Sequence, residues 1–209
     1  MTLYAYWRSS SAWRVRIALQ LKGLEHRIAS VNLLTGEHRS AAHLARSPLG
    51  QIPVLELEDG TCLTQSLAIC QYLDAVAPSP RLIPADAIGA AQVWAMAEVI
   101  NSGTQPLQNM TLLKKVEALG ADRVAWGQEV IGDGLRALQT LSEPTRGRFL
   151  FGDQVSLADL CLVPQLYNAR RFKLDLSELQ ALVDIERRCV ALPAFEQAHP
   201  SAQPDAVGA

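Results

Sequence analysis

The sequence predicts an α/β domain over residues 1–80 followed by an all-helical domain over residues 86–209. Over the first 77 residues the spacing of apolar side chains changes repeatedly, as it does where short strands alternate with helices, whereas the rest of the chain keeps a helical period. The stretch 77–84 contains three prolines, a composition typical of a linker. A chain of 209 residues is long enough to form two domains of these sizes.

The composition is that of an ordinary globular protein. Hydrophobic residues make up 49% and charged residues 19%, which excludes disordered and collagen-like chains. The 19 Lys and Arg residues against 21 Asp and Glu residues leave a formal charge of −2, so no strong overall field attracts nucleic acid or an anionic membrane. No apolar run approaches the ~18 residues of a membrane span, and the N-terminus does not resemble a secretion signal. We therefore expect a soluble cytoplasmic protein.

The N-terminal domain begins with a predicted strand–helix–strand unit. Residues 3–7 form a short aromatic strand pattern, and residues 8–11 then supply three hydroxyls before a helical pattern over residues 12–22. Gly23 stands where a helix often ends on a left-handed residue. A second strand over residues 26–31 would return beside the first and complete a βαβ unit.

The remainder of this domain predicts a hairpin and a final helix. A polar stretch with weak helical character covers residues 34–46, and an alternating strand over residues 51–57 is followed by its hairpin partner at residues 61–63. Pro53 cannot donate a backbone hydrogen bond, so it indicates a sheet edge, a bulge or a cis bond in a tight turn. Ser66 is the expected N-cap of the last helix.

The second domain is expected to be helical throughout. The helical patterns cover residues 86–115, 121–141, 178–190 and 193–199. A capping box, Ser156-Leu157-Ala158-Asp159, opens a further apolar helix. Because Asp159 is the N3 member of this box, we predict a structural role for it.

Two of the predicted helix N-termini carry hydroxyls. The loop Arg8-Ser9-Ser10-Ser11 precedes the first helix, and Gln65-Ser66 precedes the last helix of the N-terminal domain. Free backbone N–H groups at such a position favour anions. The alternative for each is that a serine simply caps its helix. Two such N-termini with Pro53 between them in the chain make a stronger indication of an anion site than either alone.

The cysteines indicate neither a disulfide nor a metal site. Cys62, Cys70, Cys161 and Cys189 are scattered through predicted strands and helices, with no CxxC motif and no histidine at metal-ligand spacing. We interpret them as buried reduced thiols and expect no bound metal.

Several motifs resemble the zeta class of glutathione transferases, the maleylacetoacetate isomerase family, in the order in which they occur there. The first resembles the family's SSCxWRVRIAL motif, and the resemblance extends from Leu3 to Gln203-Pro204-Asp205. The motifs are Arg8-Ser9-Ser10-Ser11-Ala12-Trp13-Arg14-Val15-Arg16-Ile17-Ala18-Leu19, Gln65-Ser66-Leu67-Ala68-Ile69, Gln105-Pro106-Leu107-Gln108-Asn109, Phe151-Gly152-Asp153, Leu157-Ala158-Asp159-Leu160-Cys161-Leu162-Val163-Pro164-Gln165 and Asn168-Ala169-Arg170-Arg171-Phe172-Lys173.

This resemblance implies the glutathione transferase fold, in which a thioredoxin-like domain precedes a helical-bundle domain, with glutathione as cofactor and a homodimer as the assembly. In the family, the residue before a cis-proline and a Gln/Glu-Ser pair hold the backbone and γ-glutamyl carboxylate of glutathione. By position, the residues implied in glutathione binding are Ser9, Ser10, Ser11, Arg14, Ile52, Pro53, Gln65, Ser66, Gln105, Asn109 and Thr111. Gln105, Gln108 and Asn109 would face the ligand from the first long helix of the second domain, or else form a solvent face.

The catalytic residues implied by the resemblance are Ser9 or Ser10, Arg8 and Arg171. The family often has cysteine where this chain has Ser11, and no cysteine precedes Cys62, so the reactive thiol must arrive with the ligand. Ser9, with Ser10 as competitor, is expected to favour the ionised sulfur of glutathione. Arg8 and Arg171 are assigned to substrate carboxylates and to the oxygen that becomes negative, or else form ion pairs.

The activity implied is isomerisation of maleylacetoacetate in aromatic amino-acid catabolism, the degradation of tyrosine. Isomerisation of maleylpyruvate is the nearest competing activity, and the neutral segment Asn109-Met110-Thr111 favours the larger, less densely charged substrate. Two further functions stay open for a chain with these motifs. One is a zeta-class transferase or dehalogenase acting on small α-halo acids, and the second is a non-catalytic module of the same fold.

Overall fold

The computed structural model of the protein describes residues 1–206, which divide into two compact units. The first contains Met1–Arg81 together with residues 192–206, and the second contains Leu82–Ala191. The expected order of an α/β unit and an all-helical unit is confirmed. The sequence assigned residues 86–209 to one helical domain, but in the structure residues 192–206 pack within the first unit. Residues 207–209 lie outside the described part of the chain.

The first unit is built on a four-stranded mixed sheet with the order β2-β1-β3-β4. The strands are β1 (Thr2–Ala5), β2 (Arg27–Ser30), β3 (Val54–Glu56) and β4 (Cys62–Thr64). β1 pairs with β2 in parallel, as a βαβ unit requires, and β3 pairs antiparallel with both β1 and β4. The predicted βαβ unit and hairpin are therefore confirmed.

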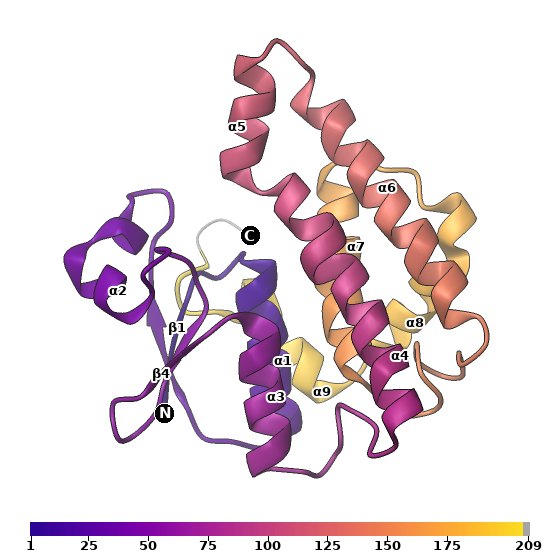
Figure 1. The fold of residues 1–209 in the computed structure, drawn as a ribbon, viewed down its shortest axis with the longest axis horizontal. Coiled ribbons are helices and arrows are strands. Elements are labelled where there is room, and N and C mark those ends of the chain that lie inside the picture. The colour runs from indigo at the N-terminus through magenta and orange to yellow at the C-terminus, as the bar shows by residue number, and fades with distance from the viewer. Residues whose placement is uncertain (207–209) are drawn as a thin grey trace. The chain divides into compact units, whose positions relative to one another are not determined.

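Helices cover this sheet, and one of them is enclosed by the unit. The helical segments of the first unit are α1 (Ser10–Leu21), the 3₁₀ turn Glu37–Arg39, α2 (Ala41–Arg46), α3 (Ser66–Val76), α9 (Pro193–Ala198) and the 3₁₀ turn Pro200–Ala202. α1 packs against both α3 and α9 (Figure 1). Its side chains are therefore buried on nearly all sides, including the charged Arg14 and Arg16.

A buried ion pair holds the far ends of α1 and α3. Nζ of Lys22 lies 2.6 Å from Oδ1 of Asp74, and the Lys22 side chain is fully buried. The same ammonium donates to the carbonyl of Pro80 in the linker. The chain leaves α1 through Gly23 at φ 62°, the predicted left-handed residue, so both ends of this helix are held by side-chain or backbone contacts.

The second unit is helical throughout the described residues. Its segments are α4 (Ala87–Glu98), a π-helical turn (Val99–Thr104), a 3₁₀ turn (Gln105–Gln108), α5 (Met110–Ala118), α6 (Arg123–Ser142), α7 (Leu157–Arg171), the 3₁₀ turn Ser177–Leu179 and α8 (Gln180–Val190). α7 is the centre of this unit, buried along most of its length and in contact with α4, α6 and α8 (Figure 1). No helix within residues 1–206 is long and apolar enough to cross a membrane.

The predicted single helix over residues 86–115 is wrong. Residues Val99–Thr104 form a wider π turn, and within it the hydroxyl of Thr104 donates to the carbonyl of Val99 at 2.8 Å. Pro106 then has no N–H to continue a helical ladder, and the chain restarts as α5 after Asn109. Interruptions of this kind often occur at functional sites.

The predicted capping box of α7 is confirmed. The carboxylate of Asp159 is completely buried and accepts from the N–H of Leu150 at 2.9 Å. It also accepts from the N–H and the hydroxyl of Ser156, both at 2.8 Å. Asp159 thus joins the start of α7 to the loop that precedes it, as its predicted structural role requires.

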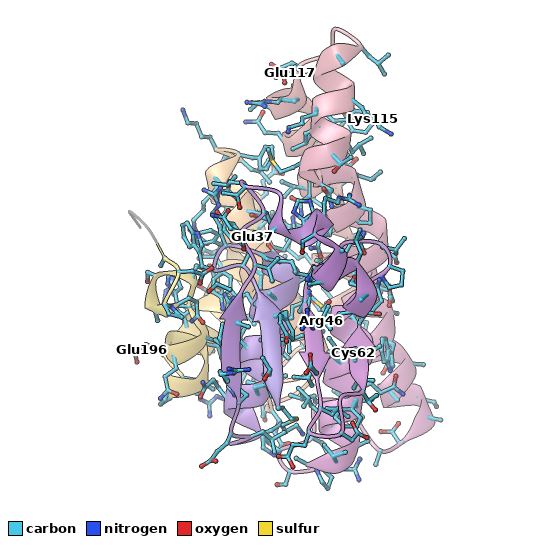
Figure 2. The ribbon with its side chains drawn as sticks, turned by 90° about the vertical axis from the view of Figure 1, so that its left-hand side faces the viewer. Glu37, Arg46, Cys62, Lys115, Glu117 and Glu196 are labelled. Atoms are coloured by element: carbon cyan, nitrogen blue, oxygen red, sulfur yellow. The ribbon has the colours of Figure 1, made fainter. Side chains whose placement is uncertain are left out.

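All four cysteines are free thiols. Cys70, Cys161 and Cys189 are buried, as expected, whereas Cys62 on β4, which is labelled in Figure 2, is half-buried and so departs from that expectation. Burial raises the pKa of both Cys62 and Cys189 above the ordinary thiol range. These sulfurs are therefore protonated at neutral pH and poorly suited to act as nucleophiles.

Candidate functional site

Ser9 is the N-cap of α1. Its backbone is extended, its carbonyl accepts from the N–H of Trp13 at 2.8 Å, and its hydroxyl oxygen accepts from the N–H of Ala12 at 3.3 Å. The helix therefore begins at Ser10, two residues earlier than the pattern predicts. Ser10 is buried and Ser11 half-buried within the first turn, so of the three serines only Ser9 lies ahead of the helix.

The Ser9 hydroxyl is suited to donate a hydrogen bond to an anion. A hydroxyl has one donor and two acceptor positions, and the bond from Ala12 uses an acceptor position. Accepting a bond polarises the O–H group and strengthens it as a donor. Ser9 is half-exposed, so a ligand can reach it, and the N-terminus of α1 adds a positive potential at the same point.

The second expected helix N-terminus has a strained entry. Gln65 has φ 68° and ψ 114°, a region that a side chain other than glycine rarely adopts, at a cost of roughly 1–3 kcal/mol. α3 begins at Ser66, so the N-cap is Gln65, without a side-chain cap, and the prediction that Ser66 caps this helix is wrong. Strain of this kind is found mainly where a ligand is bound.

Buried Arg14 connects the two helix starts. Nη1 of Arg14 on α1 donates to the hydroxyl of Ser66 at 3.3 Å, and the Arg14 side chain has no exposed surface. The guanidinium places a fixed positive charge behind the first turn of α3. The structure thus shows Arg14 supporting Ser66 rather than facing solvent.

The Ile52–Pro53 peptide bond is cis, one of the three geometries that the sequence left open. Pro53 is buried. The pairing of β3 with β1 begins one residue later, where Val54 lies opposite Tyr4. The backbone of Ile52 therefore lies just outside the sheet pairing, where a strand-like segment of a ligand could bond to it.

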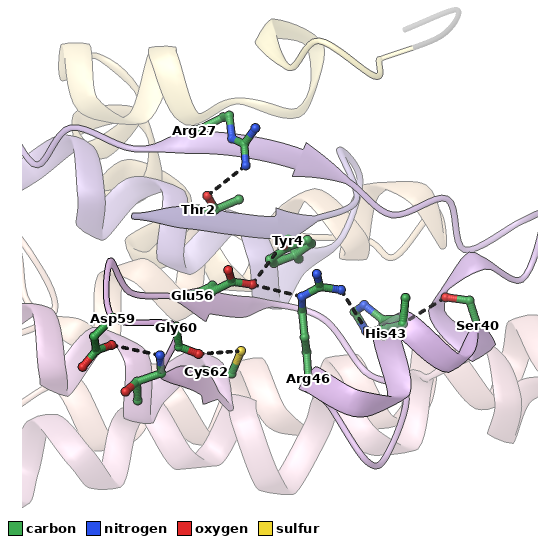
Figure 3. Close-up of polar contacts among 12 residues, drawn as sticks. Thr2, Tyr4, Arg27, Ser40, His43, Arg46, Glu56, Asp59, Gly60 and Cys62 are labelled. Carbon is green, nitrogen blue, oxygen red and sulfur yellow. Dashed lines mark hydrogen bonds and ion pairs between the residues drawn. The ribbon is translucent and has the colours of Figure 1, made fainter.

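The loop that leads to Ile52 is held to the sheet through α2. Arg46, the last residue of α2, donates from Nε to Glu56 at 3.0 Å, and Tyr4 donates to the same carboxylate oxygen at 3.0 Å (Figure 3). Hydrogen bonds from Arg46 and Tyr4 lower the pKa of Glu56, so the carboxylate stays ionised. His43 contacts the carbonyl of Gln51 through Nε2 at 3.0 Å, which fixes the residue before Ile52.

Arg8 lies at the start of the same loop as Ser9. Its guanidinium carbon is 5.3 Å from the centroid of the Trp7 ring, and its side chain is half-exposed. Stacking on an aromatic ring orients a guanidinium while leaving its N–H groups available to an anion.

The polar residues expected in the second unit fall into different environments. Gln108 is buried and paired with Gln165, from Nε2 of Gln108 to Oε1 of Gln165 at 2.6 Å and in the reverse direction at 3.3 Å. The expectation that Gln108 faces a ligand or solvent is therefore wrong. Asn109 is exposed and caps α5 by accepting from the N–H of Thr111 at 3.1 Å, and Gln105 is half-buried in the 3₁₀ turn.

Arg171 is the last residue of α7 and is exposed. Its neighbour Arg170 forms a two-pronged ion pair with Glu186, at 2.6 and 2.5 Å, and is thereby committed to the structure of the unit. Arg171 donates to the side-chain oxygen of Asn168 at 3.2 Å. An exposed guanidinium at this position is accessible to a substrate anion, which suits the role that the sequence implies for Arg171.

The position of Arg171 depends on the residue after it. The carbonyl of Phe172 accepts from Nε2 of Gln128 at 2.8 Å, and its ring covers Gly127 so closely that a Cβ there would lie 2.2 Å from Cε1. Only glycine fits beneath this ring. Nothing in the sequence pattern around Gly127 signals this contact.

We predict that Gly127→Ala lowers the free energy of unfolding by about 1–2 kcal/mol and weakens binding of a substrate anion. The added methyl must displace the Phe172 ring, at a cost that exceeds the ~1 kcal/mol gained in helix propensity. The matched control is Gly132→Ala on the same helix, where the nearest atom, 3.1 Å away, belongs to the movable guanidinium of Arg136. Urea denaturation should show a loss for Gly127→Ala only, and an equal response of both variants would contradict the prediction.

The unusual backbone of Gln65 and the Gln108–Gln165 pair were missed by the sequence patterns. A glutamine carries no local signal for a positive φ, and a buried amide pair depends on two segments that are 57 residues apart. Within the described residues, no group of three or more His, Cys, Asp or Glu side chains is placed to hold a metal ion.

The fold and this site define a class of protein. Residues 1–75 match the family model of the glutathione S-transferase N-terminal domain, and residues 108–200 match that of the glutathione S-transferase C-terminal domain. The chain belongs to the glutathione S-transferase family and, within it, to the zeta-class group of maleylacetoacetate and maleylpyruvate isomerases.

The relatives that carry this assignment match over nearly the full length of the chain. The maleylacetoacetate isomerase of Rattus norvegicus is 43% identical, over 97% of this chain and 94% of its own. A maleylacetoacetate isomerase from Anaeromyxobacter dehalogenans, with dicarboxyethyl glutathione and citrate bound in its active site, superposes with a TM-score of 0.89 at 49% identity, covering 99% of this chain and 97% of that one. A bacterial zeta-class maleylpyruvate isomerase superposes with a TM-score of 0.94 at 38% identity, covering 99% and 100%. The expected family and glutathione transferase fold are thus confirmed.

Proposed function

We propose that this protein is a glutathione-dependent cis–trans isomerase that converts maleylacetoacetate to fumarylacetoacetate. The single observation that carries the proposal is the half-exposed Ser9 hydroxyl at the N-terminus of α1. The cysteines of this unit, Cys62 and Cys70, stand elsewhere in the chain, so a serine and not a cysteine occupies this helix start. Such a group favours an ionised thiol but cannot replace one, so the thiol comes with the cofactor.

The residues present fit glutathione. The N-terminus of α3, with its strained Gln65 and supported Ser66, suits the γ-glutamyl carboxylate. The backbone of Ile52 suits the peptide portion of the cofactor, and Ser9 suits the sulfur. The A. dehalogenans relative carries a glutathione conjugate of a dicarboxylate in its active site, which supports the same pairing of cofactor and substrate class here.

When bound, glutathione would supply the thiolate whose reversible addition to the cis double bond allows rotation about it before elimination restores the double bond in the trans form. Ser9 donates its hydroxyl proton in a hydrogen bond to the sulfur and lowers the thiol pKa. Arg171 and Arg8 bind the substrate carboxylates and offset the negative charge that develops on a substrate oxygen during addition. Gln105, Asn109 and Thr111 are proposed as further contacts to the cofactor or substrate from the second unit.

We predict that Arg171→Ala raises the KM for substrate roughly tenfold or more, because a charge-assisted hydrogen bond to a carboxylate is lost. The control is Arg187→Ala, another exposed arginine of the same unit, which pairs with Asp184 at 2.9 Å. Steady-state kinetics at saturating glutathione should show the rise for Arg171→Ala alone. An unchanged KM in that variant would remove Arg171 from the substrate site.

The proposal is tested by adding maleylacetoacetate and, separately, maleylpyruvate to the purified protein with and without glutathione. We expect glutathione-dependent loss of the maleylacetoacetate absorbance, with slower turnover of maleylpyruvate because the segment Asn109-Met110-Thr111 is uncharged. Faster turnover of maleylpyruvate would identify a maleylpyruvate isomerase instead. Halide release from small α-halo acids without isomerisation would identify a dehalogenase, and no turnover of any substrate would indicate a non-catalytic module.

We also propose a cytoplasmic homodimer that acts in tyrosine degradation. Free cysteines suit a reducing compartment. On α4, the side chain of Ile88 is 74% exposed, and Ala91 and Ala95 extend the same exposed apolar face, which a second copy would cover. Sedimentation equilibrium should give twice the 22.8 kDa monomer mass. A mass of one chain would exclude the dimer.

A further inference from the structure

The segment that leads into Ser9 is held from behind by a buried arginine. Arg16 on α1 donates from Nε to the carbonyl of Ala198 at 3.1 Å and from Nη2 to the carbonyl of Trp7 at 2.9 Å. A longer bond, of 3.5 Å, joins its Nη1 to the carbonyl of Tyr6. That same carbonyl accepts from the N–H of Ser9 at 3.0 Å, so Arg16 is one hydrogen bond removed from Ser9.

A second contact reaches the same segment from the other end of the chain. Oδ2 of Asp205 accepts from the backbone N–H of Trp7 at 3.0 Å, across 198 residues of sequence. Arg16 therefore bonds the carbonyl of Trp7 while Asp205 bonds its N–H. The backbone N–H and the backbone carbonyl of Trp7, two residues before Ser9, are therefore both held by side chains.

The residues that carry Asp205 are themselves held in place. Nε2 of Gln203 donates to the carbonyls of Gln197 and His199, at 3.1 and 2.9 Å, and closes the turn after α9. The ring of His199 meets the Trp13 ring edge-on with centroids 5.2 Å apart, which ties this turn to α1. Asp205 thus extends from an anchored turn and not from a loose end.

The charge on Arg16 is retained despite its burial. Burial lowers the pKa of the guanidinium to about 10, while the nearby negative charge of Asp205 opposes this shift. At neutral pH the group is therefore positively charged, and its fork of N–H groups donates to three carbonyls.

We propose that Asp205, together with Arg16, is a positioning residue that holds the Ser9 hydroxyl in line with the thiol of bound glutathione. Neither side chain needs to touch the cofactor. Asp205 limits the movement of the Trp7 N–H, and Arg16 limits the movement of the Tyr6 and Trp7 carbonyls. Because the Ser9 N–H is hydrogen-bonded to the Tyr6 carbonyl, the backbone of Ser9 is held with them. This inference rests on the proposed function, because a position for the hydroxyl matters only if Ser9 acts on a thiol.

The test compares Asp205→Ala, Asp205→Asn and the control Glu196→Gln in the full-length chain. Glu196 is an exposed residue of α9 in the same C-terminal segment and points outward (Figure 2). For each variant, the pKa of the bound glutathione thiol is measured by thiolate absorbance, kcat and KM by steady-state kinetics, and exchange of the Trp7 and Ser9 amides by NMR. We expect Asp205→Ala to raise the thiol pKa, lower kcat roughly tenfold and speed exchange of both amides.

Asp205→Asn should have a smaller effect, because its amide oxygen still accepts from the Trp7 N–H. Glu196→Gln should match the wild type. The inference is overturned if Asp205→Ala folds and shows the same kcat and thiol pKa as Glu196→Gln, or if it changes only the melting temperature. If the wild type fails to ionise glutathione at all, the proposed function fails, and the amide exchange then shows by itself whether Asp205 holds the Trp7 peptide.

Discussion

Replacing Ser9 with alanine is expected to lower kcat by about 10²-fold at saturating glutathione and to raise the pKa of the bound thiol. The methyl group cannot donate to the sulfur, so the thiolate loses the hydrogen bond that favours it over the thiol. The measurement is the pH dependence of thiolate absorbance in the complex, combined with steady-state kinetics. A loss confined to kcat, with glutathione still bound, would identify the hydroxyl as acting on the ionised sulfur.

The same substitution also removes the N-cap of α1, so the stability effect must be separated from the chemical one. Asp122→Ala is the matched control, because Asp122 caps α6 by accepting from Val124 at 2.7 Å and Ala125 at 3.3 Å. Both variants should lose about 1 kcal/mol of unfolding free energy, but only Ser9→Ala should lose turnover. If Ser10→Ala lost turnover and Ser9→Ala did not, the role would pass to Ser10.

Replacing Asp159 with alanine is expected to lower the free energy of unfolding by about 3 kcal/mol or more. The variant leaves the N–H groups of Leu150 and Ser156 and the Ser156 hydroxyl buried without their acceptor, and each such group costs about 1–3 kcal/mol. The protein that does fold should keep the thiol pKa and KM of the wild type, since Asp159 has no part in the chemistry. A folded but inactive variant would contradict the structural role.

The nearby Asp153→Ala provides the control for this loss. Asp153 is exposed and accepts from the N–H of Arg148 at 2.9 Å. Because water can replace an exposed acceptor, its removal should cost less than about 1 kcal/mol. Equal losses in the two variants, measured by urea denaturation, would show that burial of Asp159 is not the cause of its effect.

Asp159 also predicts a pH dependence of stability. Burial raises its pKa to about 6 from the ordinary 3.8, against the opposing effect of its hydrogen bonds. The folded state therefore holds the proton more tightly than the unfolded state, so this contribution to stability is complete below about pH 4 and is lost as the pH rises through 6. Relative to Asp159→Asn, which does not titrate, the wild type should lose about 3 kcal/mol across that range. A difference independent of pH would refute the raised pKa.

Local patterns were sufficient for much of the fold. The change of apolar period predicted the two kinds of unit, Gly23 predicted the end of α1, and the spacing of Ser156 and Asp159 predicted the start of α7. Each of these depends on residues within a few positions of one another, where chain geometry alone limits the conformations. The same local reasoning placed a helix start after the serine loop, whereas its role as an anion site stays a prediction.

By itself, then, the sequence determined the family, the order of the two units and the existence of a helix after each of the segments 8–11 and 65–66, but not the residue at which either helix begins. Only the tertiary structure decided that Gln65 carries a strained backbone, that Gln108 turns inward to Gln165, and that the helix after residue 86 changes to a π turn and a 3₁₀ turn and ends before Asn109. It also decided that residues 192–206 pack with the first unit and place Asp205 against Trp7. These features depend on contacts between segments far apart in the chain, which local periodicity does not report.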